Sequence, residues 1–461
     1  MRAIMPNLSK NADDPLYIQL YAYLRDEILA GRAVPGEKLP SLRNLSSSLH
    51  ISLTTAAQAY DQLAVEGYID SRPKSGYFIN DLRRDGAGFA PAASAVETPS
   101  QELEDPQPAL LCDPSSFDFA KWKKCVNRVI NEHPRMLLSE SAPAGEPALR
   151  REIADYVYRA RGVRCEPSQI VTAAGTQQVV SLLTGIFSRI GIRDIAVEEP
   201  GYLPVREIFR ERGAVLLPVP VQEDGIQLEK LPENIRCAAY ISPANQFPTG
   251  AVLPIGRRYP LLAWAERNDS YLIEDDYDSE LRYFGRPIPS LQSLDQSGRV
   301  IYLGSFSATV FAAIRISYVI LPPALARIFH ALRETYAQTR SKMDQLTLAL
   351  FMHLGYYENG LRRMRRLYAR KLQRTEAFFE STPGVHIQSS KSGLHMLIRV
   401  ASRKPAAKLC QEAASLGIRM LPASRYADQA DARSLVFYYN RIPLAEIEPA
   451  LHRLLALWDL S

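Results

Sequence analysis

Six short apolar runs recur between residues 169 and 305, and helical stretches separate several of them. In chain order they read QIVTAAG, DIAVEE, AVLLPVPV, CAAYISP, YLIEDDY and VIYLGS, and each leads into polar or small residues. Such alternation is typical of an α/β domain with a mainly parallel sheet. Ligands of such sheets bind at the carboxyl ends of the strands, so we expect the functional site there.

A change of composition divides the chain. Residues 81–108 are rich in Ala, Pro, Gly, Ser and acidic residues, and no helical or strand period survives in them. This composition is typical of a flexible linker. We therefore predict a small N-terminal unit over residues 1–80, a linker over 81–108 and a large unit over 109–461. The large unit is expected to close with a smaller α/β subdomain after long basic helices.

The overall composition narrows the class of protein. The formal net charge is +5, the five cysteines form no CxxC pair, and the seven histidines show no metal-ligand spacing. These features favour reduced thiols in a cytoplasmic protein and predict no metal site. The N-terminus lacks the apolar core of a signal peptide, and no stretch has the length needed to span a bilayer, so we expect no membrane partner.

The N-terminal unit places apolar residues at helical spacing. Three helices are expected to bury Leu16, Leu20, Leu24 and Ile28, then Leu42, Leu45 and Leu49, then Tyr60 and Leu63. The segment YIDSRPKSGYFI has two β-rich runs around a Pro/Gly turn, which predicts a hairpin. Three short helices and a hairpin are the parts of a winged helix-turn-helix.

Residues 36–79 resemble the GntR family of winged-helix repressors. The pieces LPSxR, AYxxL, EGY and SGxF keep the order of that family, although Leu53 stands where the family usually has an arginine. The resemblance implies binding to double-stranded operator DNA. The residues that we expect to contact it are Ser41, Arg43, Ser52, Thr54, Thr55, Lys74 and Gly76. Basic and acidic residues nearly balance in this unit, so we expect tight binding only from a dimer. The alternative is a winged helix used for protein contacts.

From about residue 112 onward the chain resembles fold-type I aminotransferases, which depend on pyridoxal 5'-phosphate (PLP). The segments EEPGY, SPANQFPTG, IEDDYDSELRY and SGLHMLI keep the order and spacing of the MocR subfamily of GntR regulators. The resemblance implies a winged helix fused to an aminotransferase-like domain that binds PLP or an adduct of PLP with an amine. It also implies a head-to-tail homodimer.

Several of these motifs have residue types that suit binding of a phosphate group. Gly175, Thr176 and Gln177 end a strand and open a helix, where backbone N–H groups attract a phosphate. The alternative for this piece is an ordinary strand–helix turn. By resemblance, Ser305, Ser307 and Arg315 complete the phosphate site, and an arginine fork suits phosphate.

Three further residues would bind the cofactor ring by the same resemblance. Tyr202 would stack on it, Asp275 would hold the pyridine nitrogen, and Tyr277 would donate to the ring hydroxyl. A carboxylate beside that nitrogen keeps it protonated, which makes the ring an electron sink.

Ala308 interrupts this pattern. In the family a lysine follows the second serine of the S-F-S motif and binds the cofactor aldehyde covalently, whereas this chain has Ala308 there. An alanine can neither form that bond nor act as a base. Either the lysine was removed by engineering or this is a natural member that lost covalent attachment. We therefore predict no catalytic residue and no transaminase activity, and we expect PLP to bind without a covalent bond.

These expectations predict a dimeric, DNA-binding transcription regulator whose aminotransferase-like domain senses a small molecule. The alternatives are a PLP-dependent aminotransferase with an accessory DNA-binding domain and a scaffold with a dead pocket.

Overall fold

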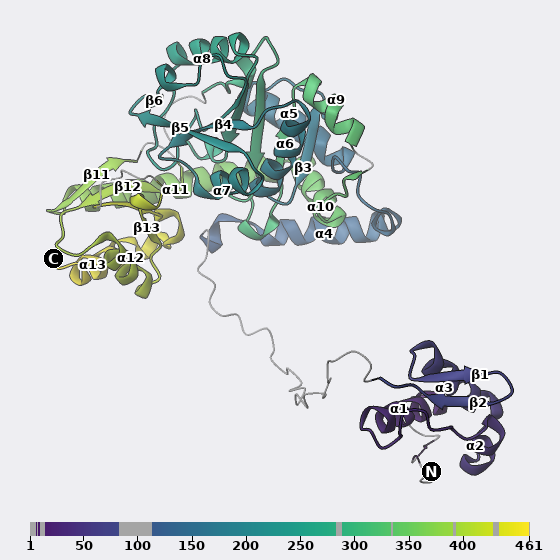
Figure 1. Ribbon diagram of the computed structural model, residues 1–461. Helices are drawn as coiled ribbons and strands as arrows, with labels where there is room; N and C mark the ends of the chain where they lie inside the picture. Colours follow the sequence, from purple (N-terminus) through teal and green to yellow (C-terminus); the bar gives the residue numbers. More distant parts are fainter. Residues whose placement is uncertain are drawn as a thin grey trace. The chain divides into compact units, whose positions relative to one another are not determined.

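The chain folds as two compact units, Met1–Glu104 and Asp105–Ser461, which we describe separately (Figure 1). The computed structural model describes residues 6, 8–9, 14–82, 113–282, 288–332, 335–390, 393–426 and 433–460. The expected linker lies, from residue 83 on, outside the described residues, so its boundaries stay a prediction. No helix among the described residues is long and apolar enough to cross a membrane.

The small unit contains the three predicted helices and the hairpin. Its elements are α1 (Leu16–Leu29), α2 (Leu42–Leu49), α3 (Leu53–Val65), β1 (Ile69–Arg72) and β2 (Gly76–Ile79). The two strands are antiparallel, with Ile69 opposite Ile79. Leu20, Tyr60 and Leu63 are fully buried, because the apolar faces of the helices pack against one another. The winged helix-turn-helix prediction is confirmed at the level of the fold.

An eight-stranded sheet forms the centre of the large unit. Its strands are β3 (Ile170–Ala173), β4 (Asp194–Glu199), β5 (Val215–Gln222), β6 (Gly225–Ile226), β7 (Ala238–Ile241), β8 (Tyr271–Asp276), β9 (Val300–Ser305) and β10 (Ser317–Ile320). The strand order is β3-β10-β9-β8-β7-β4-β5-β6. Neighbours from β9 to β5 are parallel, whereas β10 runs antiparallel to both β3 and β9. The six predicted runs all form strands, and the prediction of a mainly parallel sheet is confirmed.

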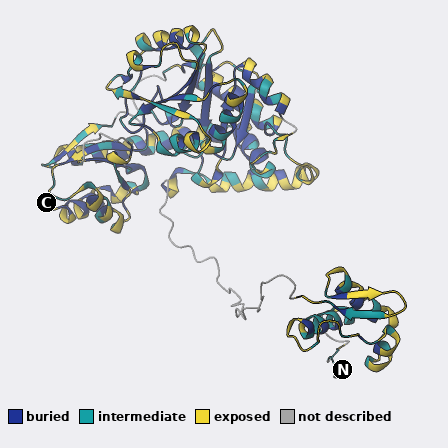
Figure 2. Cartoon of the chain, viewed as in Figure 1, coloured by how far each residue is buried: buried dark blue, intermediate teal, exposed yellow. Residues whose placement is uncertain are grey.

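Helices cover both faces of this sheet, and most strands between them are buried, whereas β5 is partly exposed (Figure 2). The helices are α4 (Phe119–Glu132), α5 (Pro147–Arg161), α6 (Thr176–Arg189), α7 (Leu203–Glu211), α8 (Ile255–Arg267), α9 (Pro323–Leu332) and α10 (Lys342–His353). Helices α6, α7 and α9 share a core with Ile273, Leu303 and Val319. Helices α5 and α10 pack with Tyr302, and α8 packs with Leu272. Successive strand residues point to opposite faces of the sheet, so neighbouring residues such as Tyr302 and Leu303 pack against different helices.

The last part of the chain forms the expected smaller α/β subdomain. Its elements are α11 (Tyr356–Glu380), β11 (Val385–Ser389), β12 (Met396–Val400), α12 (Ala406–Ser415), β13 (Met420–Pro422), β14 (Ser434–Phe437) and α13 (Ile447–Leu457). The strands form an antiparallel sheet in the order β11-β12-β14-β13. Its apolar side packs with α13 in a separate core that includes Leu372 of α11. The C-terminal part of α11 therefore belongs to the core of this subdomain, whereas Tyr357 and Leu361 at its start pack in the core that contains Tyr302.

A buried ion pair ties the start of the large unit to this subdomain. Lys371 of α11 is fully buried, and its ammonium lies 2.5 Å from the Asp113 carboxylate. The same ammonium donates to the Asn440 carbonyl at 2.8 Å. Burial opposes ionisation of Asp113, but hydrogen bonds from Lys371 and Ser115 outweigh it and lower the pKa. Lys371 therefore joins the segment before α4 to the small subdomain.

Replacing Lys371 by methionine should destabilise the large unit by about 3–5 kcal/mol, because Asp113 would remain buried without its cation. Urea unfolding followed by tryptophan fluorescence tests this. All three tryptophans of the sequence, Trp122, Trp264 and Trp458, lie in the large unit. Lys121→Met is the control, since Lys121 forms an exposed ion pair at 3.7 Å and should cost less than about 1 kcal/mol. Equal losses of unfolding free energy in the two variants would contradict a stabilising role for the buried pair of Lys371 and Asp113.

Candidate functional site

The sheet brings the predicted ligand residues to one edge. Ser317 at the start of β10 pairs with Ser305 at the end of β9 and with Ala173 at the end of β3. Asp276 at the end of β8 pairs with Gly304 of β9. The antiparallel β10 thus starts where its neighbours end. The segments after β3, β8 and β9 and the segment before β10 meet there as expected.

Gly175 and Arg315 form the first part of the site. Gly175 caps the N-terminus of α6 with a φ of 88°, and a side chain there would collide with the Arg315 guanidinium. The guanidinium therefore lies against the Gly175 backbone, beside the positive end of the α6 dipole. Arg315 has a φ of 46°, in the left-handed region. A helix N-terminus beside a guanidinium attracts an anion. Thr176 opens α6 and is half-buried, whereas Gln177 is exposed.

The serines after β9 extend this cradle. The Ser305 hydroxyl accepts the Ser307 N–H at 3.3 Å and a hydrogen bond from the Ser317 hydroxyl at 3.0 Å. The Ser307 hydroxyl is buried, and it has no hydrogen-bond partner among the described residues. A buried hydroxyl without a partner is costly, so the atom is suited to a ligand. With Arg315 and α6 it fits a phosphate group.

Asp275 of β8 supplies an acid to the same edge. Its carboxyl group is buried and accepts a hydrogen bond from the Tyr240 hydroxyl through Oδ2. The other oxygen, Oδ1, is buried without a partner in the described part of the chain. Burial raises the pKa of Asp275 to about 7, although the Tyr240 hydrogen bond opposes the shift. A cationic ring nitrogen would both satisfy Oδ1 and stabilise the charged carboxylate.

The neighbouring acids have structural partners. Asp276 forms a buried ion pair with Arg161 at 2.7 Å. Glu274 accepts hydrogen bonds from the backbone N–H groups of Leu291 and Gln292, at 2.7 and 2.9 Å. These contacts hold β8 to the segments beside it.

Asn245 connects the ring side of the site to the loop after β7. Its amide nitrogen donates to the Tyr277 hydroxyl at 3.1 Å and to Asp278 at 2.6 Å. Gly393 of the small subdomain lies so close that a side chain there would collide with Asp278. The Tyr277 hydroxyl is therefore held in place by an amide. The sequence offered no sign that Asn245 would contact Tyr277, or that Tyr240 would contact Asp275.

Tyr202 follows β4 and lies near the same groups. The exposed fraction of Tyr202 is 40 %, and the rest of its surface is buried against the protein. This burial raises the pKa of the hydroxyl; the Asp275 charge raises it further and Arg315 lowers it. The Tyr202 ring meets Phe247 edge-on, with centroids 5.8 Å apart. The Tyr202 hydroxyl thus lies close enough to both Asp275 and Arg315 for their charges to act on it.

Ala308 leaves the site without an amine at the family position. It follows Ser307 in the segment after β9 and is half-buried. The buried lysine of α11, Lys371, is held by Asp113 and the Asn440 carbonyl. Among the described residues, no group of three or more His, Cys, Asp or Glu side chains could hold a metal ion.

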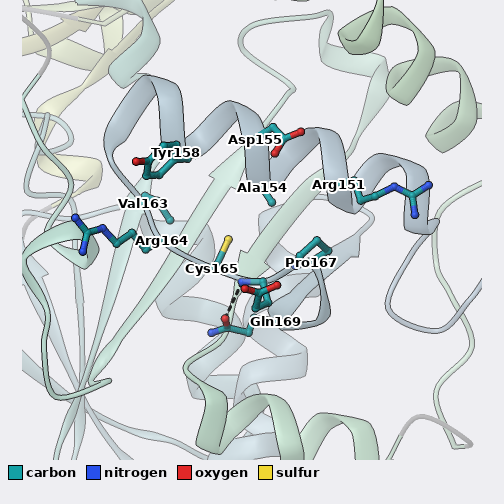
Figure 3. Close-up of a pocket in the computed structure, with 10 residues that line it drawn as sticks. Arg151, Ala154, Asp155, Tyr158, Val163, Arg164, Cys165, Pro167 and Gln169 are labelled. Atoms are coloured by element: carbon teal, nitrogen blue, oxygen red, sulfur yellow. Dashed lines mark hydrogen bonds between the residues drawn. The ribbon is translucent and has the colours of Figure 1, made fainter.

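A large open groove lies at a different place. It has a volume of about 660 Å³ and is lined by α5 and the segment that follows it, including Arg151, Tyr158, Arg164 and Cys165 (Figure 3). None of the predicted ligand residues lines it. Size alone therefore does not identify the site of this protein.

In the small unit, the predicted DNA-contacting serines cap helices. Ser41 accepts the Asn44 N–H at 3.3 Å at the start of α2, and Arg43 in the first turn is exposed. Ser52 accepts the Thr55 N–H at 3.0 Å at the start of α3, and Thr54 is exposed.

The predicted contacts of the hairpin are Lys74 in its turn and Gly76 at the start of β2. Lys74 is exposed and has a φ of 63°. Gly76 has a φ of 103°, and a side chain there would press on Lys38. Lys74 thus lies in the turn of the hairpin and Lys38 lies beside Gly76. The DNA contacts themselves stay a prediction.

Each of the two units matches a known protein family. Residues 16–79 match the family described as bacterial regulatory proteins, gntR family, and residues 113–430 match aminotransferase class I and II. An uncharacterized HTH-type transcriptional regulator of Bacillus subtilis, YdeL, is 36% identical over 99% of this chain and 100% of its own length. The HTH-type pyridoxine biosynthesis transcriptional regulator PdxR of Corynebacterium glutamicum is 34% identical over 98% of this chain and 99% of its own.

The probable rhizopine catabolism regulatory protein MocR of Rhizobium meliloti is 33% identical, over 91% of this chain and 88% of its own. Among solved structures, the α-aminoadipate aminotransferase LysN of Thermus thermophilus matches 77% of this chain and 93% of its own with a TM-score of 0.67 and 24% identity. This likeness shows the fold. The chain therefore belongs to the gntR family of bacterial regulatory proteins, as one of the MocR-type transcription regulators that join a DNA-binding winged helix to an aminotransferase class I and II domain.

Proposed function

We propose that the large unit is a sensor that binds PLP, or an adduct of PLP with an amine, without a covalent bond and without transaminase activity. The observation that supports this proposal most is that Ser307 Oγ and Asp275 Oδ1 are buried without a hydrogen-bond partner among the described residues, beside an alanine at the family lysine position. PLP carries a phosphate and a protonatable ring nitrogen, and each suits one of these atoms. The relative named for pyridoxine biosynthesis supports a regulatory role for this chemistry.

Each group of the site has a role in this proposal. The phosphate binds the α6 N-terminus at Gly175, Thr176 and Gln177, together with Ser305, Ser307 and Arg315. Asp275 holds the ring nitrogen, Tyr277 positioned by Asn245 contacts the ring hydroxyl, and Tyr202 covers the ring. When bound, PLP supplies an aldehyde and an electron-withdrawing ring. The chain itself binds and orients these groups, and Ala308 leaves it without a base at the aldehyde.

The small unit reads double-stranded operator DNA in this proposal, and the full protein acts as a head-to-tail homodimer. Its expected contacts are Ser41, Arg43, Ser52, Thr54, Thr55, Lys74 and Gly76. Ligand binding shifts the population of arrangements of the two DNA readers and so changes operator affinity.

An active transaminase with an accessory DNA-binding arm is the alternative. Full-length protein mixed with PLP and amino acids distinguishes the two, because an enzyme would convert the amino acids to oxo acids. A scaffold that binds neither PLP nor its adducts is the third possibility.

Calorimetry should detect reversible PLP binding near the micromolar range, about −8 kcal/mol, since several charge-assisted contacts act together. Arg315→Ala should abolish most of it, because the phosphate would lose its arginine. Asp275→Ala should cost less, since it removes one partner at the other end of the ligand. Arg212→Ala, which removes an exposed arginine on another surface, should change nothing. Equal losses for the first two variants would refute this ranking, and no binding by the parent protein would refute the cofactor site.

Ala308→Lys should allow a covalent bond to PLP. The new amine would condense with the aldehyde, losing water, to form a carbon–nitrogen double bond that borohydride reduces to a stable single bond. Mass spectrometry should then find the label on residue 308. Ala313→Lys is the control, because it places a lysine at an exposed position of the same segment. Labelling of both lysines to the same extent would mean that PLP reacts at the surface, not in this site.

Arg43→Ala should weaken operator binding across all sequences and reduce the salt dependence by about one counterion, if Arg43 contacts phosphate. The probe is a duplex selected by the natural full-length protein from a random pool. Arg32→Ala removes an equal charge that instead pairs with Glu27, and it should have little effect. An unchanged affinity in the Arg43 variant would show that α2 does not approach the DNA.

A further inference from the structure

Helix α3 has two chemically different sides. Its buried side consists of Ala56, Ala59, Tyr60 and Leu63, all fully buried in the small unit. The opposite side exposes Leu53, Thr54, Gln58 and Asp61. Thr54, Gln58 and Asp61 follow the spacing of one helical face, and Leu53 lies beside them at the N-terminal end. The helix LTTAAQAYDQLAV contains no arginine or lysine.

Two of the expected base-reading groups are already occupied. The Ser52 hydroxyl accepts the Thr55 N–H at 3.0 Å, and the Ser52 and Thr55 hydroxyls lie 2.7 Å apart. One of the two hydroxyls donates to the other at the helix cap, so each already has a partner within the protein. Leu53, Thr54 and Gln58 therefore remain as the exposed side chains of the first two turns, where a recognition helix meets base edges.

Leu53 is an apolar side chain at a place where polar contacts are usual. It is the first residue of α3, and 50 % of its surface is exposed. The apolar group that base pairs present in the major groove is the thymine methyl. A leucine in this position suits thymine and offers nothing to guanine.

Gln58 lies one turn beyond Thr54 on the exposed side of α3. It is exposed, and among the described residues its amide has no hydrogen-bond partner. A glutamine amide can donate to N7 and accept from the N6 amino group of adenine at once. The commonest specific contact to guanine comes from arginine or lysine, which α3 lacks.

We infer that α3 reads A·T base pairs at the centre of each operator half-site, with Leu53 against a thymine methyl and Gln58 on an adenine. This inference rests on the proposed DNA binding and adds two specificity-determining residues to it. Arg43 on α2 and Lys74 in the wing then contribute affinity through phosphates, and α3 contributes the choice of base.

The test starts with selection of duplexes from a random pool by the natural full-length protein. We expect enriched sequences with A·T pairs at the central positions of each half-site. In the selected duplex, deoxyuridine in place of the contacted thymidine removes only the methyl group. This should lower the affinity of the natural protein about fourfold, the value of one buried methyl. The Leu53→Ala variant should not respond to the replacement.

The glutamine contact is tested in the same duplex with 7-deaza-deoxyadenosine, which lacks the N7 acceptor. The natural protein should lose at least about fivefold in affinity, and Gln58→Ala should lose nothing further. The controls are Leu29→Ala, which removes a leucine that is also 50 % exposed but lies on α1, and Gln62→Ala. Gln62 is an exposed glutamine of α3 that bonds instead to Glu66, and both controls should respond to the modified bases like the natural protein.

The outcomes distinguish a failure of the A·T inference from a failure of the proposed DNA binding. If no sequence is enriched, the protein does not read DNA and both fail. If sequences are enriched around G·C pairs, or if deoxyuridine costs the natural protein nothing, DNA binding stands and the A·T inference is wrong. An equal deoxyuridine penalty in Leu53→Ala would assign the methyl contact to another residue and overturn the role of Leu53.

Discussion

The insertion of an antiparallel strand, β10, between β3 and β9 is the constraint on which the ligand site depends. In a fully parallel sheet the start of a strand lies at the edge opposite to the ends of its neighbours. Because β10 runs the other way, the residue just before it, Arg315, lies beside the ends of β3 and β9. The guanidinium can then rest on Gly175, where only a residue without a side chain leaves room. One reversed strand thus adds a cation to an edge that already carries a helix N-terminus.

The pKa of Asp275 is set by burial and by the charge of the neighbouring acid. Asp275 is buried, and the charge beside it, on Asp276, is of the same sign. Its pKa is therefore raised to about 7, and part of the population is neutral at neutral pH. A ligand that carries a positive nitrogen changes this balance, because it stabilises the ionised form. The buried Asp275 carboxyl group is therefore suited to a partner that carries a positive charge.

The sequence predicted the sheet well because apolar runs and turns are local signals. All six runs became strands, and the motifs at their ends came together because parallel strands end at one edge. The four-residue strand β10 was missed, although Tyr318, Val319 and Ile320 are typical strand residues, and its antiparallel direction leaves no local signal in the sequence. Contacts such as Tyr240 with Asp275 join residues 35 positions apart, and a single sequence carries no sign of them. Helix caps depend on local sequence, and Ser41 and Ser52 cap α2 and α3.

The exposed groups of α3 differ in whether they already have a partner within the protein. A serine at a helix start suggests both a cap and a base contact, and the geometry shows that Ser52 is used as a cap. The unit is nearly neutral, so phosphate attraction is weak and each base contact counts for more of the total affinity. A recognition helix without a cation must then obtain its preference from shape and neutral hydrogen bonds. For such a helix, Leu53 and Gln58 are the exposed groups that can distinguish one base pair from another.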